Sequence, residues 1–107
     1  MKNVKKILFV FSTLFLMSFS FPSFAKGNLT LYCSVEIEVC ELLIQGFKKD
    51  TGIDVAMTRK SSGETFAQIK AESSNPKGDV WYGGTGDPHL TAAQENLTEK
   101  YKSKHFD

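Results

Sequence analysis

The chain has 107 residues, of which 41% are hydrophobic and 23% charged, and its formal net charge is +1. A chain of this length has room for one small domain with a modest core. Its near-neutral charge, without a basic patch, excludes the surfaces by which proteins usually bind nucleic acid.

The first 25 residues have the features of a secretory signal peptide. Three lysines near the start precede an uncharged, largely apolar run over residues 7–21, and small residues stand just before Lys26. The run is shorter than the roughly 20 apolar residues of a membrane-spanning helix. We therefore expect export and cleavage after Ala25. The mature chain would then be residues 26–107, located in the periplasm, with ten basic and twelve acidic side chains and a formal charge of −2.

The mature chain begins with a predicted strand and a predicted helix. Residues 29–33 are apolar and β-rich, which predicts a buried strand. Ser34 is placed to cap a helix over about 36–50, and Gly52 is placed to end it. Apolar residues at helical spacing predict the face that this helix buries: Ile37, Cys40, Leu43, Ile44 and Phe47.

Cys33 and Cys40 are the two cysteines of the chain, and both belong to the exported part. An even number of cysteines in an oxidising compartment favours a disulfide. A redox-active pair is an alternative, although the spacing is not Cys-x-x-Cys. A metal site is a further alternative that would need ligands from elsewhere in the chain. A disulfide here would join the end of the strand to the first turns of the helix.

A second strand and helix follow. Residues 53–58 alternate between apolar and polar side chains and predict a strand. Ser61 and Glu64 match the Ser-x-x-Glu capping box of a helix start, and the Asn-Pro pair at 75–76 would stop that helix. The expected buried side of the helix consists of Phe66, Ala67, Ile69 and Ala71.

A third strand over residues 80–82 leads into a glycine-rich turn at 83–86. The Asp87-Pro88 pair that follows is typical of a helix start, with Asp87 as the N-cap residue. Beyond Tyr101 the chain is polar, and no further element is predicted. The helical spacing predicts that this last helix buries Leu90, Ala93 and Leu97.

The six elements alternate as β-α-β-α-β-α with short links, which predicts an α/β fold with a parallel sheet and crossover helices. In such a sheet the strand-to-helix junctions meet at one edge, where ligands bind. Helix starts offer unpaired N–H groups to an anion. The alternative is three ordinary turns whose glycines relieve backbone strain. The candidate ligand-binding residues at the three junctions are Ser34, Ser62, Gly63, Thr85 and Gly86.

The sequence contains no recognisable catalytic arrangement. The two histidines and scattered carboxylates form no triad or acid–base pair. The glycine turn is not a G-x-G-x-x-G fingerprint, and it lacks the lysine of a P-loop. We therefore expect a binding protein that needs no cofactor, with a small phosphate-handling enzyme as the alternative.

Several stretches together resemble the periplasmic solute-binding proteins of ABC importers, in the branch that carries ferric iron and phosphonates. The resemblance covers nearly all of residues 28–103. It implies two α/β lobes that close on a ligand, and delivery of that ligand to an ABC permease in the inner membrane. Members of the family are roughly three times as long, so the chain is expected to be a truncated, partial N-terminal lobe. The stretches that carry the resemblance are residues 31–34, 47–53, 59–64 and 79–88.

The resemblance implies capture of ferric iron or of a small anion such as phosphate or a phosphonate. In the iron-binding members the tyrosines that dominate coordination come from a later part of the chain, which has no counterpart here. The identity of any metal ligand is therefore left open, and an anion fits the candidate residues better. A non-functional exported fragment of such a protein is the remaining alternative. Side chains suited to a hard cation are present, and each also has an ordinary structural explanation: Tyr32, Glu64, Tyr82, Asp87 and His89.

Overall fold

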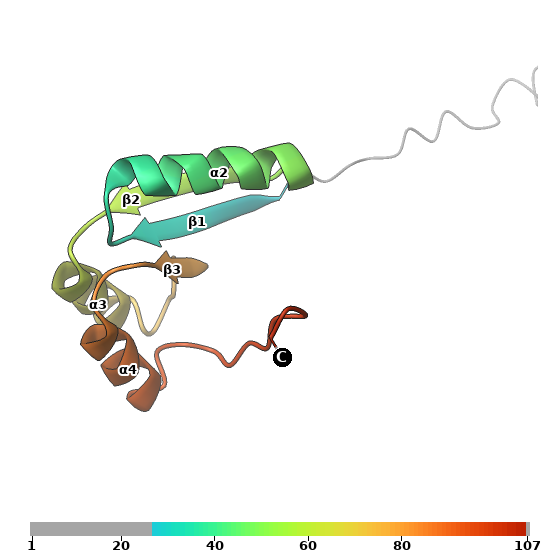
Figure 1. Ribbon diagram of the computed structural model, residues 1–107. Coiled ribbons are helices and arrows are strands. Elements are labelled where there is room, and N and C mark those ends of the chain that lie inside the picture. The colour runs from blue at the N-terminus through green and yellow to red at the C-terminus, as the bar shows by residue number, and fades with distance from the viewer. Residues whose placement is uncertain (1–26, 107) are drawn as a thin grey trace, which may run out of the picture.

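The computed structural model describes residues 27–106 (Figure 1). The expected signal peptide, residues 1–25, lies outside the described residues. None of the helices in the described part is long and apolar enough to cross a membrane. Strands and helices alternate as predicted, in the order β1 (Asn28–Cys33), α2 (Ile37–Thr51), β2 (Asp54–Arg59), α3 (Ser62–Ala71), β3 (Val80–Tyr82) and α4 (Gly86–Gln94).

The three strands form one parallel sheet in the order β2-β1-β3, which confirms the predicted α/β fold. β1 is the central strand and pairs with β2 along its whole length. The shorter β3 pairs with the second half of β1, so that Leu31 lies beside Val80 and Cys33 beside Tyr82. All three strands therefore end at the same edge of the sheet, where the chain enters each helix.

Side chains of β1 alternate between two environments. Leu31 and Cys33 face α2 and belong to the small apolar core, which Cys40 completes. Tyr32 faces the other way, where its hydroxyl donates to Glu72 Oε2 at the end of α3, at 2.7 Å. Figure 1 shows α2 lying along one side of the sheet, with α3 and α4 grouped beyond the ends of the strands.

Helix α2 carries the predicted apolar face and ends as predicted. Gly52 adopts a left-handed conformation, with φ 72°, and its N–H donates to the Lys48 carbonyl. However, Cys40 is the one buried side chain of this helix, while Leu43 is 46% exposed and Phe47 36% exposed. The predicted face exists, but the described residues cover only its middle: Cys40 is buried and Ile44 half-buried, while Ile37 at its start is 42% exposed.

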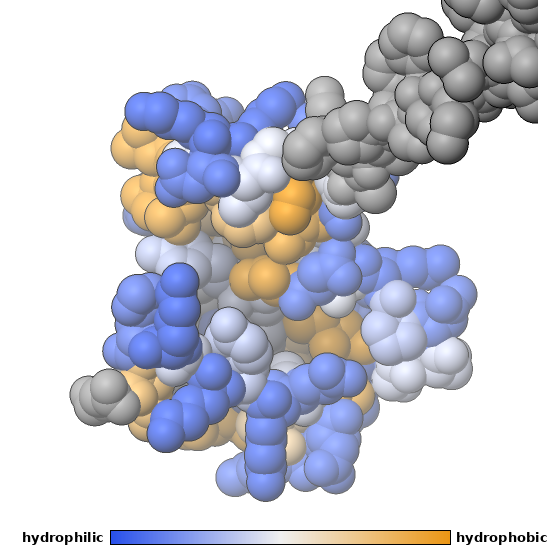
Figure 2. Space-filling model, turned by 90° about the vertical axis from the view of Figure 1, so that its right-hand side faces the viewer, coloured by the Kyte–Doolittle hydropathy of each residue, from blue (hydrophilic) through white to orange (hydrophobic). Residues whose placement is uncertain are grey.

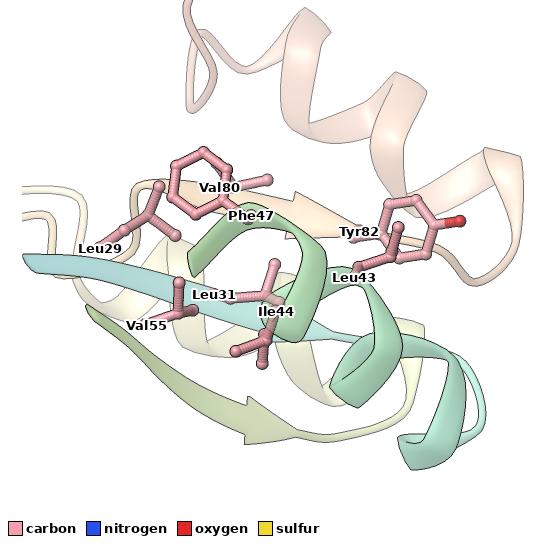
Figure 3. A pocket seen from close by; sticks show the side chains of 8 residues that line it. All are labelled: Leu29, Leu31, Leu43, Ile44, Phe47, Val55, Val80 and Tyr82. Carbon is pink, nitrogen blue, oxygen red and sulfur yellow. The ribbon is translucent and has the colours of Figure 1, made fainter. Parts of the chain in front are cut away.

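A hollow of about 240 Å³ lies beside this exposed face. Its lining is entirely apolar apart from one tyrosine ring, and Figure 3 shows side chains from α2 and from all three strands around it. Apolar surface is also visible among hydrophilic side chains in the space-filling view (Figure 2). The lining residues are Leu29, Leu31, Leu43, Ile44, Phe47, Val55, Val80 and Tyr82.

Two predicted helix caps are wrong. α2 has Glu36 at its N-cap and no side-chain cap, because the Ser34 hydroxyl bonds to Thr65 and Trp81 instead. α4 begins at Gly86 with Thr85 at the N-cap, so Asp87 lies inside the first turn rather than before it. A carboxylate in that position still interacts favourably with the helix dipole. The capping box of Ser61 and Glu64 is confirmed at α3.

The predicted buried faces of α3 and α4 are also partly wrong. Thr65 is the buried side chain of α3, while Ala67 and Ala71 are exposed. In α4 the buried side chain is Ala92. Leu90 and Ala93 are exposed because no described element covers that side of the helix, and Leu97 is half-buried just beyond the helix.

Candidate functional site

The three strand-to-helix junctions meet at the carboxyl edge of the sheet. Two backbone hydrogen bonds extend the sheet pairing into these junctions. The Ser34 N–H donates to the Tyr82 carbonyl at 2.9 Å, and the Lys60 N–H donates to the Cys33 carbonyl at 3.0 Å. The residue that follows β1 is thereby fixed against the end of β3, and the residue that follows β2 against the end of β1.

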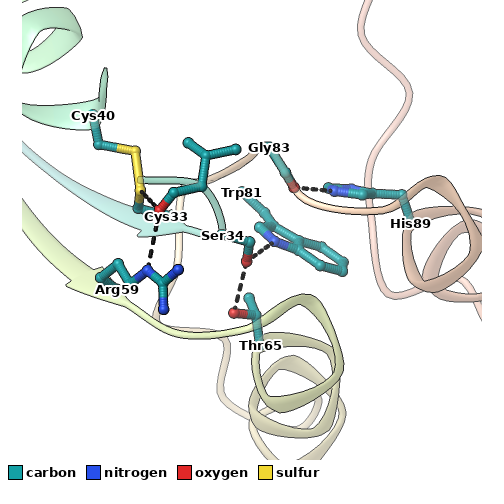
Figure 4. The surroundings of a disulfide bond; sticks show 9 residues. Cys33, Ser34, Cys40, Arg59, Thr65, Trp81, Gly83 and His89 are labelled. Atoms are coloured by element: carbon teal, nitrogen blue, oxygen red, sulfur yellow. Dashed lines mark hydrogen bonds between the residues drawn. A yellow bond between two sulfur atoms is a disulfide. The ribbon is translucent and has the colours of Figure 1, made fainter. Parts of the chain in front are cut away.

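Ser34 connects the first junction to the other two. Its Oγ lies 2.9 Å from Trp81 Nε1 on β3 and 3.1 Å from Thr65 Oγ1 on α3 (Figure 4). Ser34 is half-buried and Thr65 is 1% exposed. The hydroxyl predicted to cap α2 therefore holds β1, β3 and α3 together at the edge.

Ser62 and Thr85 are brought together in the same region. The Thr85 N–H donates to Ser62 Oγ at 3.0 Å, which ties the start of α4 to the first turn of α3. Gly84, which directly precedes Thr85, has φ 91°, a conformation that residues other than glycine rarely adopt. A Cβ at Gly84 would collide with Ser62 Oγ and lie 3.0 Å from Ser34 Cβ. The glycine is thus required by the close approach of two serines.

Gly63 and Gly86 occupy a more open position. Both are exposed, and a Cβ at either residue would meet no atom within 4 Å. They lie in the first turns of α3 and α4, where backbone N–H groups have no partner within their own helix. The structure therefore joins Ser34, Ser62 and Thr85 through shared contacts and leaves the two glycines at the solvent side of the same helix starts.

Trp81 and His89 make a ring contact at this edge that the sequence patterns did not predict. Their rings stack with centroids 3.7 Å apart and an interplanar angle of 24°. His89 Nε2 lies 2.8 Å from the Gly83 carbonyl, and the residue is half-buried rather than fully solvated. The eight-residue separation across the glycine turn has no periodicity that would indicate this contact. It depends on the reversal made by Gly83 and Gly84, both at positive φ.

The disulfide between Cys33 and Cys40 is confirmed, and it fixes the start of α2 beside the end of β1. Both cysteines are fully buried. Close by, Arg59 Nε donates to the Val35 carbonyl at 3.0 Å, while Lys60 Nζ donates to Gln68 Oε1 at 2.7 Å. Of these two cations, Arg59 is the more exposed one at this edge.

Three of the five candidate metal ligands, Tyr32, Glu64 and His89, are engaged in structural hydrogen bonds. Burial, and then the hydrogen bond to Glu72, raise the pKa of Tyr32 to about 12, so its phenol stays protonated. Hydrogen bonds from Ser61 hold the pKa of the Glu64 carboxyl below its usual value and fix that side chain in the capping box. Within residues 27–106, no group of three His, Cys, Asp or Glu side chains is arranged to hold a metal ion.

Known proteins that resemble this chain include a curated relative and periplasmic binding proteins of known structure. No family model matches the chain. It is 46% identical over 83 residues to an uncharacterized protein of Haemophilus influenzae, a match that covers 78% of this chain and 24% of that protein.

Two solved structures are also similar. The periplasmic binding protein P5PA has 44% identity and a TM-score of 0.70, over 73% of this chain and 25% of that one. The periplasmic binding protein AfuA from Actinobacillus pleuropneumoniae, solved with exogenous fructose-6-phosphate bound, has 42% identity and a TM-score of 0.72, over 75% and 25%. The chain thus spans about a quarter of the length of the proteins that it matches.

Proposed function

Because this chain belongs, by sequence and fold, to the periplasmic solute-binding proteins as part of one lobe, we propose that it captures a small phosphorylated anion for import. The ligand would bind at the carboxyl edge of the sheet, in contact with Ser34, Ser62, Gly63, Thr85 and Gly86. An ABC permease in the inner membrane would be the partner that receives it, and the periplasm the place of capture.

The observation that carries this proposal is the convergence of hydroxyl and N–H groups from three junctions. Ser34 and Ser62 flank Gly84 so closely that no side chain fits between them. The first turns of α3 and α4 add N–H groups whose partners must come from outside the helix. A phosphate group offers several acceptor oxygens, which such a set of donors can bind at once.

The comparison with AfuA supports the same ligand class, since that protein was solved with a sugar phosphate bound and is 42% identical over the shared region. Ferric iron is less well supported. Tyr32 is a buried phenol bonded to Glu72, and Glu64 is fixed in its capping box. We therefore propose a phosphate ester rather than the metal as the group that this edge recognises.

The test is an NMR titration of the exported chain with fructose 6-phosphate, inorganic phosphate, a phosphonate and ferric citrate, with fructose as the neutral control. Backbone resonances of residues 62–63 and 84–87 should shift with the phosphorylated ligands and not with fructose. The Ser62→Ala variant should bind about tenfold more weakly, because it loses one hydrogen bond to a charged group. Ser73→Ala is the matched control, since Ser73 is exposed on the turn after α3. Shifts confined to other regions, or none at all, would contradict the proposed site.

We also propose that the chain has no catalytic turnover. Incubation with phosphate esters should release no inorganic phosphate above the level of a buffer control. Release that disappears in the Ser62→Ala variant would instead favour the enzyme alternative.

A further inference from the structure

The direction of the hydrogen bond between Thr65 and Ser34 is fixed by burial. Thr65 is 1% exposed, so water does not reach its hydroxyl. Among residues 27–106, Ser34 Oγ is the one hydrogen-bond partner of Thr65 Oγ1, at 3.1 Å. A buried hydroxyl hydrogen without an acceptor is costly, whereas an unused lone pair costs much less. The Thr65 hydroxyl therefore donates, and Ser34 Oγ accepts.

Trp81 adds a second donor to the same oxygen. The indole Nε1 carries a hydrogen and has no lone pair to accept with, so its 2.9 Å contact with Ser34 Oγ has a single possible direction. A serine hydroxyl has two acceptor lone pairs and one hydrogen. With both lone pairs filled by Thr65 and Trp81, Ser34 can make further hydrogen bonds only as a donor.

We infer that Thr65 and Trp81 are positioning residues that hold Ser34 as an obligatory hydrogen-bond donor, so that the edge selects a fully deprotonated phosphate dianion over its protonated monoanion. The inference rests on the proposed function, because the acceptor for the Ser34 hydrogen is the ligand. A phosphate oxygen without a proton accepts this hydrogen bond. A P–OH group turned toward Ser34 would place two donors face to face.

Charged groups on the neighbouring elements do not supply a competing acceptor to Ser34. Within the described residues, none of them contacts Ser34 Oγ, and most have other partners. Ser62 Oγ similarly accepts the Thr85 N–H, which leaves its own hydrogen free to donate. Among the charged and titratable groups of the junctions, Arg59 is hydrogen-bonded to Val35, and Lys60 is hydrogen-bonded to Gln68. Glu64 is hydrogen-bonded to Ser61, and His89 is hydrogen-bonded to Gly83. Asp87 lies in the first turn of α4.

The first experiment tests the direction without any ligand. NMR of the exported chain should show a slowly exchanging hydroxyl proton correlated with Thr65, because a buried, hydrogen-bonded hydroxyl exchanges slowly with water. The signal should vanish in Ser34→Ala, and the Trp81 indole N–H resonance should shift. A slowly exchanging hydroxyl proton on Ser34 instead of Thr65 would overturn the inference.

The second experiment measures selectivity for the charge state of the ligand. The second pKa of a phosphate ester is about 6, so fructose 6-phosphate is mainly dianionic at pH 7.5 and monoanionic at pH 5. The dissociation constant of the unaltered chain should rise about tenfold between these pH values. In Thr65→Val and Trp81→Phe, a freed lone pair on Ser34 can accept from P–OH, so the rise should shrink to about threefold or less. Thr65→Ser keeps the hydroxyl and should restore the full tenfold rise.

The outcomes separate this inference from the proposed function. Phosphate-dependent shifts at residues 62–63 and 84–87, with the same pH dependence in all variants, would overturn the positioning role and leave the site standing. Absence of any phosphate-dependent shift would remove the proposed function and the selectivity together, whatever the hydroxyl proton shows.

Discussion

The two faces of β1 differ in how well residues 27–106 cover them. On one face, Tyr32 donates to Glu72, and the junction residue Ser34 joins Thr65 and Trp81, so polar groups are buried with partners. On the opposite face, Leu29 and Leu31 line a hollow that α2 covers only in part. The polar face is thus built by contacts within the described part of the chain, whereas the apolar face leaves large side chains in contact with solvent.

This difference indicates where the stability of the chain resides. Burial of apolar surface usually contributes most to the stability of a folded protein, yet only five hydrophobic residues of the described part are buried. We expect the disulfide and the hydrogen bonds at the carboxyl edge to offset the small core, as disulfides do in small secreted domains. Changes at the edge should therefore cost more stability than changes at the hollow.

The largest effect is expected at Gly84. Substitution by alanine forces a side chain into a positive-φ conformation and against Ser62, so the free energy of unfolding should fall by about 2 kcal/mol or more. Urea unfolding followed by circular dichroism measures this. Gly46→Ala is the matched control: a Cβ at Gly46, within α2, would meet no atom within 4 Å, and alanine there should stabilise by about 0.5–1 kcal/mol. Equal effects of the two substitutions would show that the close approach at Gly84 is not maintained in solution.

A smaller effect is expected at Tyr32, where replacement by phenylalanine removes the hydrogen bond to Glu72. The free energy of unfolding should fall by about 1–2 kcal/mol at pH 7. The variant should also change the response to alkaline pH. The pKa of Tyr32 is raised from 10.0 to about 12, so the unfolded chain loses this proton first and its contribution to stability declines between pH 10 and 12.

Urea unfolding from pH 8 to pH 12 checks this prediction. The unaltered chain should lose stability more steeply than Tyr32→Phe above pH 10. Tyr101→Phe is the control, because Tyr101 is 88% exposed and outside the helices and strands. Parallel curves for the unaltered chain and Tyr32→Phe would contradict the buried, protonated phenol.

Sequence patterns predicted the order of elements, the parallel sheet, the disulfide and the capping box of α3. These features depend on residues close in sequence or on general rules of chain connection. The caps of α2 and α4 were predicted wrongly because the residues at these helix starts have distant partners. Ser34 contacts Thr65 and Trp81, 31 and 47 positions away, and Thr85 contacts Ser62, 23 positions away. A local pattern does not contain such partners.

The same limit applies to the candidate site. Small residues at three junctions predicted that these junctions meet at one edge of the sheet, and the structure brings Ser34, Ser62 and Thr85 into one group there. Ligand binding at this edge stays a prediction. The buried hydroxyl of Thr65 and the stacking of Trp81 on His89 were not predicted, since each depends on tertiary packing. The exposure of Leu43 and Phe47 was also missed, because a helical apolar stripe predicts a face to be buried without naming what covers it.

The smallest effect on stability is expected at the hollow. Leu43 is 46% exposed, so Leu43→Lys exchanges one partly solvated side chain for another and should change the free energy of unfolding by about 0.5 kcal/mol or less.

The effect of Leu43→Lys should appear instead in the binding of an apolar fluorescent dye, which detects exposed hydrophobic surface. Dye fluorescence should be strong with the folded, unaltered chain and much weaker with Leu43→Lys, because a charge would enter a hollow lined by apolar groups. Lys49→Ala changes an exposed residue near the end of α2 that does not line the hollow, and it should leave dye binding unchanged. If Leu43→Lys were instead as destabilising as Gly84→Ala, the hollow would be part of the folding core, and the two faces of β1 would contribute equally to stability.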